Sequence, residues 1–180
     1  CEYLTDVWPN MAVFFHGGIS FEPYRDQYKT LIPSDRMRYM ETYNASEGFF
    51  GLQDDPARHS LLLMIDYGIF FEFIPINEVG SEHPNILPLE AVEIGKNYAM
   101  VITTAGGLWR YQIGDTIRFT SLYPYKFVIS GRTKNFINAF GEELMVDNAD
   151  KAISNVCRLT GAKVKEYTAA PLFMLDKAKG

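Results

Sequence analysis

Short apolar runs separated by turn residues fill most of the stretch between Ser60 and Ser130, and this pattern limits what the chain can fold into. A short apolar run bounded by glycine, proline or aspartate is typical of a β-strand rather than a helix. We therefore expect a strand in each run, and a hairpin between the first two runs around Asp66-Tyr67-Gly68. The runs are Leu61–Ile65, Ile69–Ile76, Tyr98–Thr104, Leu108–Gln112, Thr116–Leu122 and Lys126–Ser130.

The residues before this stretch alternate between strand and helix patterns. Asn10–Gly18 is an apolar run ended by a glycine pair, which predicts a buried strand followed by a turn. Phe21–Ile32 has apolar side chains at helical spacing, so we expect a short amphipathic helix that ends before Pro33. A strand over Met37–Tyr43 and a loop over Asn44–Gly51 complete this part.

The pattern changes again near Gly131–Lys134. After a short extended segment, Glu142–Leu159 has the spacing of a helix and Lys163–Leu175 that of a strand. We therefore expect an α/β (mixed α+β) protein, strand-rich over residues 1–131, in which residues 132–180 begin a βαβ-type unit. Both ends of the chain resemble cuts in a longer sequence.

Composition excludes several functional classes. The formal net charge of −5 argues against a general nucleic-acid or anionic-membrane surface, since both require basic patches. Two cysteines and three scattered histidines offer neither a disulfide framework nor metal-ligand spacing. Leu61–Ile65, the longest aliphatic stretch, is too short to span a bilayer, and we do not expect the first residues to act as a signal peptide. We expect a cytoplasmic protein with small-molecule partners; its oligomeric state is not predicted.

Tyr43–Gly48 is the strongest local signal for chemistry. A strand ends in an aromatic residue, and a hydroxyl and a carboxylate follow it. This arrangement can stack a base on Tyr43, place Ser46 near a phosphate and let Glu47 hold Mg²⁺, which prefers oxygen ligands. The alternative is a strand end at which Ser46 and Glu47 only cap the next turn.

Three further segments contain candidate nucleotide contacts. Asp115 follows the glycine of Leu108–Asp115 and can accept hydrogen bonds from ribose hydroxyls, or else from the backbone of a hairpin. Arg132 can bind ribose or phosphate and Lys134 can act as a hinge, or both can be solvated charges of a linker. His16–Ser20 contains two glycines that permit a flat ring to approach the backbone, or form a plain turn.

The four segments, in this order, resemble the adenylate-forming superfamily of acyl-CoA synthetases, luciferases and peptide-synthetase adenylation domains. Within it the chain is most similar to the auxin-responsive acyl-acid amido synthetase (Gretchen Hagen) family. Tyr43–Gly51, Phe71–Pro75 and Gly107–Asp115 carry this similarity, which extends from about Trp8 to Ala152. The resemblance implies that residues 1–131 are the C-terminal portion of a large ATP- and acyl-binding domain, with a sheet and a small β-barrel. Residues 132–180 would be the hinge and the beginning of a small C-terminal domain.

The resemblance also implies roles for individual residues. Among the nucleotide-binding residues, Gly17 and Gly18 would form the adenine segment, and Tyr43 would pack on the adenine. Ser46, next to Ala45, would lie near the α-phosphate, and Glu47 would hold magnesium. Asp115 would bind the ribose diol, and Arg132 would contact ribose or phosphate. Lys134 would be the hinge, and His16, Phe49 and Phe50 would line an acyl pocket. Phe14 and Phe15 are further candidates for that pocket, although aromatic residues beside predicted strands are more often plain core.

The implied reaction uses ATP and Mg²⁺ in two steps. A carboxylate attacks the α-phosphate to give an acyl-adenylate and pyrophosphate, and an amine, usually that of an amino acid, then displaces AMP to form an amide. An acyl- or aryl-CoA ligase that uses coenzyme A, and a non-catalytic strand-rich binding domain, are the alternatives.

The sequence departs from the family pattern at several points. Ala45 stands where a serine is usual, and Gln112 stands where an arginine is usual. The Ser/Thr/Gly-rich phosphate loop and the late catalytic lysine have no counterpart in these 180 residues. We therefore expect both outside this chain, and expect the chain alone to bind nucleotide weakly and not to catalyse adenylation.

Overall fold

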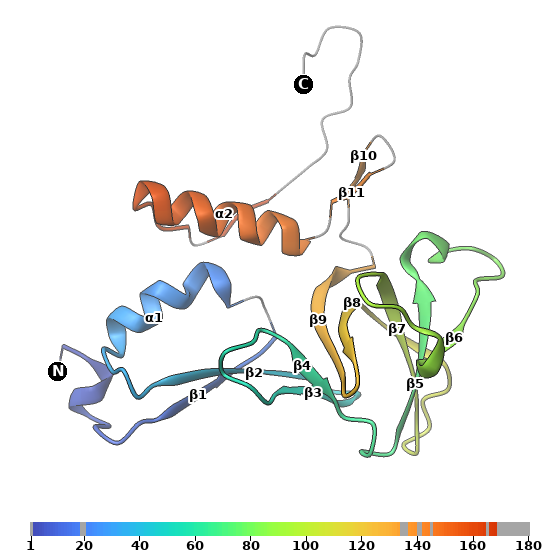
Figure 1. Cartoon of the computed structure of the whole chain (residues 1–180), viewed down its shortest axis with the longest axis horizontal. Coiled ribbons are helices and arrows are strands. Elements are labelled where there is room, and N and C mark those ends of the chain that lie inside the picture. Colours follow the sequence, from blue (N-terminus) through green and yellow to red (C-terminus); the bar gives the residue numbers. More distant parts are fainter. Residues whose placement is uncertain are drawn as a thin grey trace, which may run out of the picture.

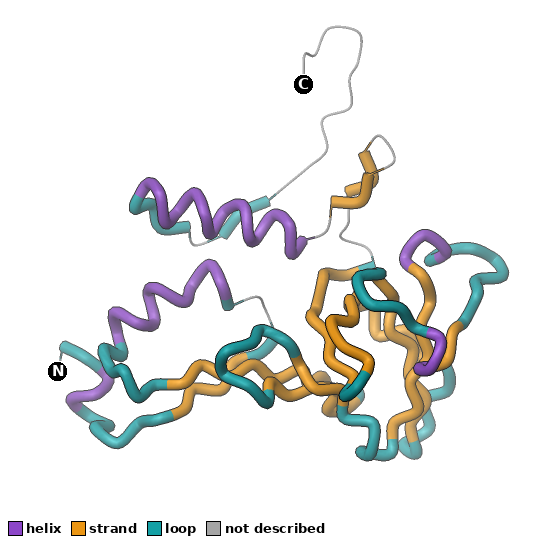
Figure 2. The backbone as a smooth tube through the Cα atoms, in the orientation of Figure 1, coloured by secondary structure: helices purple, strands orange, loops and turns teal. Residues whose placement is uncertain are grey.

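Nine strands join in one mixed sheet that curves strongly between its two ends (Figures 1 and 2). The computed structural model describes residues 2–18, 21–133, 137–139, 142–144, 146–164 and 166–168. The strand order is β1-β2-β3-β4-β9-β8-β7-β5-β6. The bounds are β1 (Val13–His16), β2 (Arg38–Ala45), β3 (Gly48–Gln53), β4 (Leu61–Leu63), β5 (Ile69–Pro75), β6 (Leu87–Pro88), β7 (Asn97–Thr104), β8 (Tyr111–Leu122) and β9 (Tyr125–Arg132).

Two helices and a small hairpin lie beside this sheet. Their bounds are α1 (Arg25–Leu31), α2 (Val146–Thr160), β10 (Ile137–Ala139) and β11 (Glu142–Leu144). The described residues also contain four 3₁₀ turns, η1 (Leu4–Asp6), η2 (Glu22–Tyr24), η3 (Ile76–Glu78) and η4 (Leu89–Ala91). Helix α2 lies against η2 and β9, and it runs above α1 in Figure 1. None of the helices in the described residues is long and apolar enough to cross a membrane.

The main core fills the concave side of the antiparallel strands. Phe50, Phe73, Phe119 and Phe127 are all fully buried there, on four different strands. Phe73 and Phe119 meet edge to face, with ring centroids 5.1 Å apart at 78°. Burying a large apolar side chain contributes about 1.5–3 kcal/mol, so this aromatic core is the main source of stability for the sheet.

A second, smaller core lies between α1 and the β1–β2 pair. It contains Phe21, Ile32, Met37 and Tyr39, and Phe14 of β1 packs against them. These two strands are the parallel pair of the sheet. The helix and the two strands predicted for this region are therefore confirmed. β1 is an edge strand, because it stands at the end of the strand order. It is not fully buried as predicted, because the Val13 and Phe15 side chains on its other face are 45% and 60% exposed.

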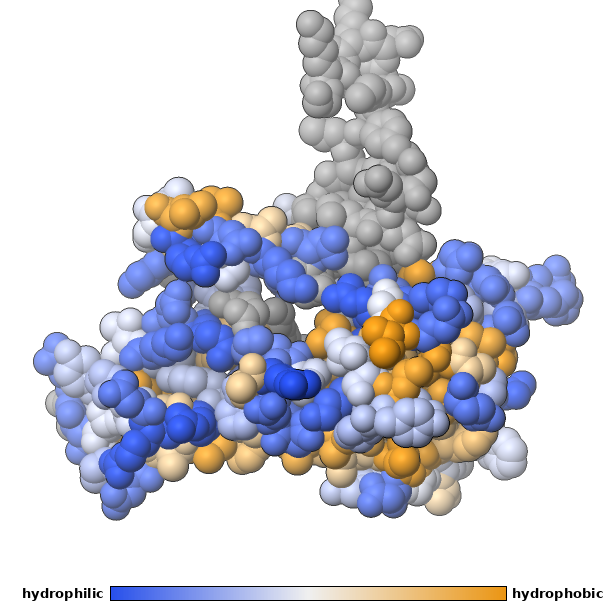
Figure 3. Space-filling model, in the orientation of Figure 1, coloured by the Kyte–Doolittle hydropathy of each residue, from blue (hydrophilic) through white to orange (hydrophobic). Residues whose placement is uncertain are grey.

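The outer face of the sheet contains one buried charge. Glu72 of β5 is only 7% exposed, and the Arg110 guanidinium donates two hydrogen bonds to its carboxylate, at 3.0 and 2.8 Å. Arg110 has a positive φ of 45°, and its N–H donates to Thr103 Oγ1 at 3.1 Å. The paired charge and this backbone bond fix the entry of the chain into β8. Figure 3 shows apolar surface gathered over the antiparallel half of the molecule, whereas the α1 half is more hydrophilic.

Several local predictions were wrong. The hairpin around Asp66-Tyr67-Gly68 does not form, because β4 pairs with β3 and β9 while β5 pairs with β6 and β7. The loop expected over Asn44–Gly51 is instead the end of β2, a two-residue turn and the start of β3. The strand expected at Leu108–Gln112 starts only at Tyr111, and it continues without a break through the strand expected at Thr116–Leu122 as the single strand β8.

The strand-rich α/β class is confirmed, with two changes to its parts. The sheet and barrel expected as separate units are one curved sheet of the described strands. The C-terminal helix begins at Val146 because Glu142–Leu144 pairs with β10. Residues 163, 164 and 166–168 are not in a strand, and the rest of the strand expected over Lys163–Leu175 lies outside the described residues. A domain boundary after residue 131 stays a prediction.

Candidate functional site

The carboxylate of Asp115 is the centre of the candidate site. The Tyr43 hydroxyl donates a 2.7 Å hydrogen bond to Oδ2, and Arg132 Nε donates a 3.0 Å hydrogen bond to Oδ1. These residues come from β8, β2 and β9. Because β3, β4 and β9 separate β2 from β8 in the sheet order, the Tyr43–Asp115 bond crosses the inside of the curved sheet. The fold thus joins three residues that the sequence places up to 89 positions apart.

A bulge in β8 aims Asp115 at its two partners. Ala99 pairs with Thr116 and Val101 with Gln112, so β8 has extra residues between these pairs. Gly114 lies in this bulge with φ at +89°, a value that favours glycine, and its carbonyl accepts the N–H of Thr133 at 2.8 Å. A β-bulge re-aims the side chains beside it. The glycine predicted as a turn residue is therefore a bulge residue inside a strand.

Tyr43 belongs to the core through its ring and to the site through its hydroxyl. The side chain is 5% exposed, and its ring centroid lies 5.0 Å from that of Phe50 and 6.0 Å from that of Phe127. Little of the ring is exposed in the described residues, and its hydroxyl contacts Asp115. The expected stacking of adenine on Tyr43 stays a prediction.

Burial raises the pKa of the Tyr43 hydroxyl far above its usual value, and the negative charge of Asp115 and their hydrogen bond raise it further. Arg132 acts in the opposite direction, and Glu47 adds a smaller upward effect. The charges of Glu47, Asp115 and Arg132 therefore all lie near one buried hydroxyl. The structure brings these four predicted residues together.

This raised pKa makes stability depend on pH in the alkaline range. Above a pH of about 10 the unfolded chain loses the Tyr43 proton while the folded protein keeps it, so the unfolded state binds fewer protons. The free energy of unfolding should then fall as the pH rises past 10, by up to about 1.4 kcal/mol per pH unit from this group. Urea unfolding at several alkaline pH values measures the slope.

The Tyr43→Phe variant is the control for this pH dependence. The pKa values of Tyr39 and Tyr167 are also raised, but both residues remain in the variant. The difference between the two proteins therefore isolates Tyr43. Equal alkaline slopes in both proteins would contradict the buried, protonated hydroxyl.

The turn between β2 and β3 contains the candidate phosphate and magnesium residues. The Ser46 hydroxyl donates to Glu47 Oε2 at 3.2 Å, and Ala45 pairs with Gly48 across the turn. The described residues contain no group of three or more His, Cys, Asp or Glu side chains that could hold a metal by themselves. Mg²⁺ is commonly held by one or two carboxylates together with substrate phosphates and water. The single carboxylate of Glu47 fits that kind of shared site.

The predicted adenine segment lies beside the same turn. His16, the last residue of β1, pairs with Glu41 in the parallel β1–β2 ladder. Gly17 therefore lies beside the part of β2 that leads to Tyr43. A Cβ added to Gly17 would lie 2.5 Å from the Thr42 carbonyl oxygen, so only glycine permits this approach. Ligands of open α/β sheets bind at the carboxyl ends of parallel strands, which is where these residues lie. Gly18 has a positive φ of 86°.

The expected acyl pocket is not assembled from the residues proposed for it. His16 stacks on Phe21 with ring centroids 4.1 Å apart, next to the α1 core. Phe50 is fully buried in the main core, and Phe49 packs on Tyr67 instead. Phe50 is therefore part of the core of the described residues, and the acyl-pocket roles stay predictions. Lys134, the expected hinge, lies outside the described residues, as do Ile19 and Ser20.

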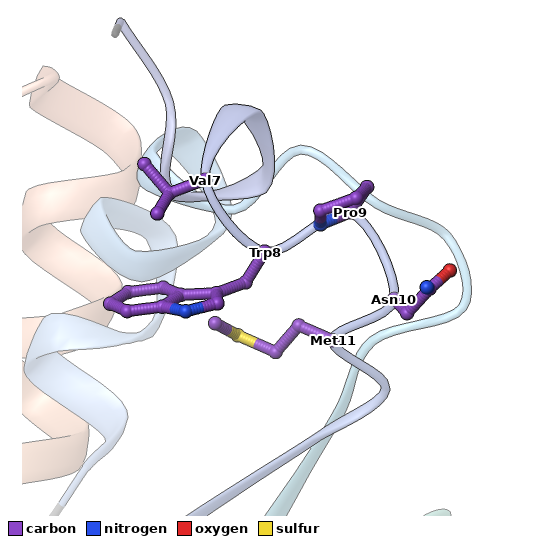
Figure 4. A pocket seen from close by; sticks show the side chains of 5 residues that line it. All are labelled: Val7, Trp8, Pro9, Asn10 and Met11. Carbon is purple, nitrogen blue, oxygen red and sulfur yellow. The ribbon is translucent and has the colours of Figure 1, made fainter.

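A shallow hollow lies elsewhere, near the N-terminal end of the described chain. Figure 4 shows its lining, in which the Trp8 and Met11 side chains lie side by side. All of its lining residues fall in Val7–Met11. None of the predicted site residues belongs to it.

Sequence reasoning missed one part of the site and one ion pair on the outer face of the sheet. It assigned no role to Thr133, whose N–H and hydroxyl both bind the Gly114 carbonyl and so hold the bulge against β9. It also gave Glu72 and Arg110 no function, although they stand in Phe71–Pro75 and Gly107–Asp115, two segments that carry the family similarity. A lone acidic residue inside the apolar run Ile69–Pro75 was the available signal, since a buried charge needs a partner.

Comparison with known proteins identifies the relatives of the chain. Residues 62–132 match the GH3 family central domain. The chain is 33% identical over 187 residues to the indole-3-acetic acid-amido synthetase GH3.4 of Arabidopsis thaliana, covering 92% of this chain and 30% of that protein. It is 32% identical over 185 residues to GH3.8 of Oryza sativa subsp. indica, covering 92% of this chain and 29% of that protein.

This chain is a relative of the GH3 family. The resemblance inferred from the sequence is confirmed, and the chain spans about 30% of the length of these relatives. The GH3.15 acyl acid amido synthetase has the same fold over 88% of the chain and 28% of that protein, with a TM-score of 0.66 and 24% identity. A second structure of that protein, in complex with 2,4-DB, gives a TM-score of 0.67 at 21% identity, over 94% of this chain and 35% of that protein.

The GH3 match contains only part of the candidate site. Asp115 and Arg132 lie within residues 62–132, as do Glu72 and Arg110. Tyr43 lies before the matched range, together with the adjacent turn. The site therefore joins the GH3 central domain to the strands that precede it.

Proposed function

We propose that this chain is the ribose- and magnesium-holding part of a GH3-type, ATP-dependent acyl acid amido synthetase. The arrangement around Asp115 carries the proposal. An ionised carboxylate has two oxygens and about four acceptor sites. Tyr43 takes one site on Oδ2 and Arg132 takes one on Oδ1, which leaves one site on each oxygen. Two free acceptor sites at carboxylate spacing match the two adjacent hydroxyls of a ribose.

The remaining residues are assigned around that ribose. Gly17 and Gly18 would flank the adenine, and Ser46 with the backbone at Ala45 would lie near the α-phosphate. Glu47 would hold Mg²⁺, which would neutralise charge on the phosphates. Arg132 is 62% exposed at its side chain, so it is free to turn from Asp115 toward a ribose or phosphate oxygen. Lys134 keeps its proposed hinge role.

The proposed reaction has two balanced steps. A carboxylate oxygen of the acid bonds to the α-phosphorus of ATP while the bond to pyrophosphate breaks. An amine nitrogen, such as that of an amino acid, then attacks the acyl carbon, AMP leaves with the bonding electron pair, and the amine proton is released. The relatives are named as amido synthetases, which favours an amine over coenzyme A as the acceptor. A cytoplasmic setting and dependence on Mg²⁺ stay predictions.

ATP–pyrophosphate exchange by the full-length protein tests the proposal. Exchange should require both a carboxylic acid and Mg²⁺, and indole-3-acetic acid is the first acid to try because two relatives are named for it. Amide formation with an amino acid, in preference to thioester formation with coenzyme A, would separate the two enzymatic alternatives. A protein that neither exchanges pyrophosphate nor binds ATP or AMP in calorimetry would instead be a strand-rich binding domain.

A further inference from the structure

We propose that Glu72 and Arg110 are positioning residues, and that their ion pair on the outer face of the sheet sets where Asp115 stands. The inference rests on the proposed function, since it takes Asp115 to be a nucleotide-binding residue. Its basis is the bulge in β8 that contains Asp115. The ion pair fastens the chain on one side of this bulge, and the main core fastens it on the other.

The bulge must be held from both sides if Asp115 is to keep its place. Between two ladder pairs of β7 and β8, Met100 alone stands opposite the three residues Ile113–Asp115. If the start of β8 moved along the ladder by one residue, a different set of residues would fill the bulge. The Asp115 side chain would then point in another direction, because successive side chains of a strand face opposite sides.

Burial in the main core fixes only the later end of the bulge. Thr116, Ile117 and Phe119 are all fully buried, and the last two belong to the main core. By contrast, none of the residues from Tyr111 to Asp115 is buried, and Ile113 packs on that core only in part. Register is weakly specified where a strand buries few apolar side chains. The start of β8 therefore needs an anchor other than the core.

Arg110 supplies that anchor through three hydrogen bonds. Its guanidinium donates to the two carboxylate oxygens of Glu72 from Nε and Nη2, and its N–H donates to Thr103 Oγ1. Two parallel bonds between a guanidinium and a carboxylate fix direction as well as distance. Because Glu72 lies on β5 and Thr103 on β7, the residue before β8 is fastened to two strands of the sheet at once.

The conformation of Arg110 and the burial of Glu72 both favour a positioning role. In the part of the chain that the structure describes, no other non-glycine residue has a positive φ. Such a strained backbone persists only where its surroundings hold it, and it is frequent at functional sites. Glu72 places a carboxylate with 7% exposure in an otherwise apolar strand. An ion pair with a buried member adds little net stability, and fixing a register is its best-attested use.

A double-mutant cycle between Arg110 and Asp115 tests the inference, with AMP as the probe in calorimetry on the full-length protein. Arg110→Ala should weaken AMP binding by roughly tenfold, because Asp115 loses its place. In an Asp115→Ala background the same substitution should change AMP binding by less than about twofold, because the residue through which Arg110 acts is already gone. A merely structural role would weaken binding equally in both backgrounds.

Two other substitutions at position 110 separate the side chain from the backbone. Arg110→Gly adopts a positive φ without strain but lacks the guanidinium, so it should weaken AMP binding as the alanine variant does. It takes the place of Arg110→Ala in the cycle if the alanine variant does not fold. Arg110→Lys keeps the charge but not the planar fork, so its affinity for AMP should lie between that of Arg110→Ala and that of the wild type.

Asp54→Asn is the matched control. Lys126 Nζ donates to both carboxylate oxygens of Asp54 at 2.8 Å, so this ion pair also joins segments that are distant in the sequence. It fastens β9 to the residue after β3 and does not hold the bulge. Asp54→Asn should therefore leave the affinity for AMP unchanged.

Four outcomes decide against the inference. Equal weakening by Arg110→Ala in the two backgrounds would overturn it and leave the proposed function standing. Wild-type affinity for AMP in Arg110→Gly would do the same, because the ion pair would then be dispensable. So would a loss in Asp54→Asn as large as that in Arg110→Ala. If Asp115→Ala alone binds AMP as tightly as the wild type, the proposed site fails together with this inference.

Discussion

Asp115→Ala in the full-length protein is expected to lower ATP–pyrophosphate exchange by roughly a hundredfold or more. A hydrogen bond to a charged group is worth about 1.5–3 kcal/mol, and the variant loses both bonds to the ribose diol. It also leaves the buried Tyr43 hydroxyl without its acceptor and frees Arg132. Exchange should be measured at several ATP concentrations, because a lost binding contact raises the Michaelis constant for ATP.

Two further variants separate the site from general effects of lost charge. Asp66→Ala removes an exposed carboxylate from the turn after β4, and exchange should remain near the wild-type rate. Asp115→Asn preserves the shape but removes the charge and replaces one acceptor oxygen by an NH₂ donor, so a loss smaller than that of the alanine variant is expected. Exchange by Asp115→Ala within about threefold of wild type would exclude the diol-binding role.

Local strand patterns were readable from the sequence because they depend on neighbouring residues. β7 and β9 were predicted close to their observed bounds, since each is an apolar run bounded by turn residues. The helix before Pro33 was also predicted, because α1 turns one apolar face onto β1 and β2. Asp115 could be singled out as a candidate because it stands in a recognisable segment.

Pairing between distant strands could not be read in the same way. Leu61–Leu63 and Ile69–Pro75 are separated by a turn of hairpin type, yet three strands that come later in the sequence lie between them in the sheet. Local patterns carry no information about which later strands will insert. The two-residue turn at Ser46-Glu47 was missed because Asn44–Gly51 is rich in small and polar residues, as loops are.

The roles of the aromatic residues were the least predictable part of the site. An aromatic residue at a strand end can stack on a ligand or fill a core, and the sequence does not distinguish the two. In the described residues the rings of Tyr43 and Phe50 both lie in the main core, because the curved sheet folds over them. The hydrogen bond between Tyr43 and Asp115 spans 72 positions and depends on that curvature, so it could only be seen in the structure.

Phe127→Ala is expected to lower the free energy of unfolding by about 3–5 kcal/mol, the usual cost of removing a buried phenylalanine ring. Phe127 is fully buried on β9, between the two halves of the curved sheet. It pairs with Leu61, and its ring lies where a side chain on Gly51 would be, since an added Cβ there would come within 2.8 Å of it. Because β3, β4 and β9 all meet at this ring, the cavity cannot close without moving a strand.

Chemical denaturation should therefore show a lower midpoint with an unchanged slope, and Phe70→Ala is the matched control. Phe70 lies on β5 with 61% of its side chain exposed, so the same substitution should cost less than about 1 kcal/mol there. Phe127 also forms one wall against the Tyr43 ring. A tight core at this position is what fixes the Tyr43 hydroxyl on Asp115, so Phe127→Ala should also weaken AMP binding under conditions where the variant remains folded. Equal losses of stability in the two variants would contradict the central place of Phe127 in the core.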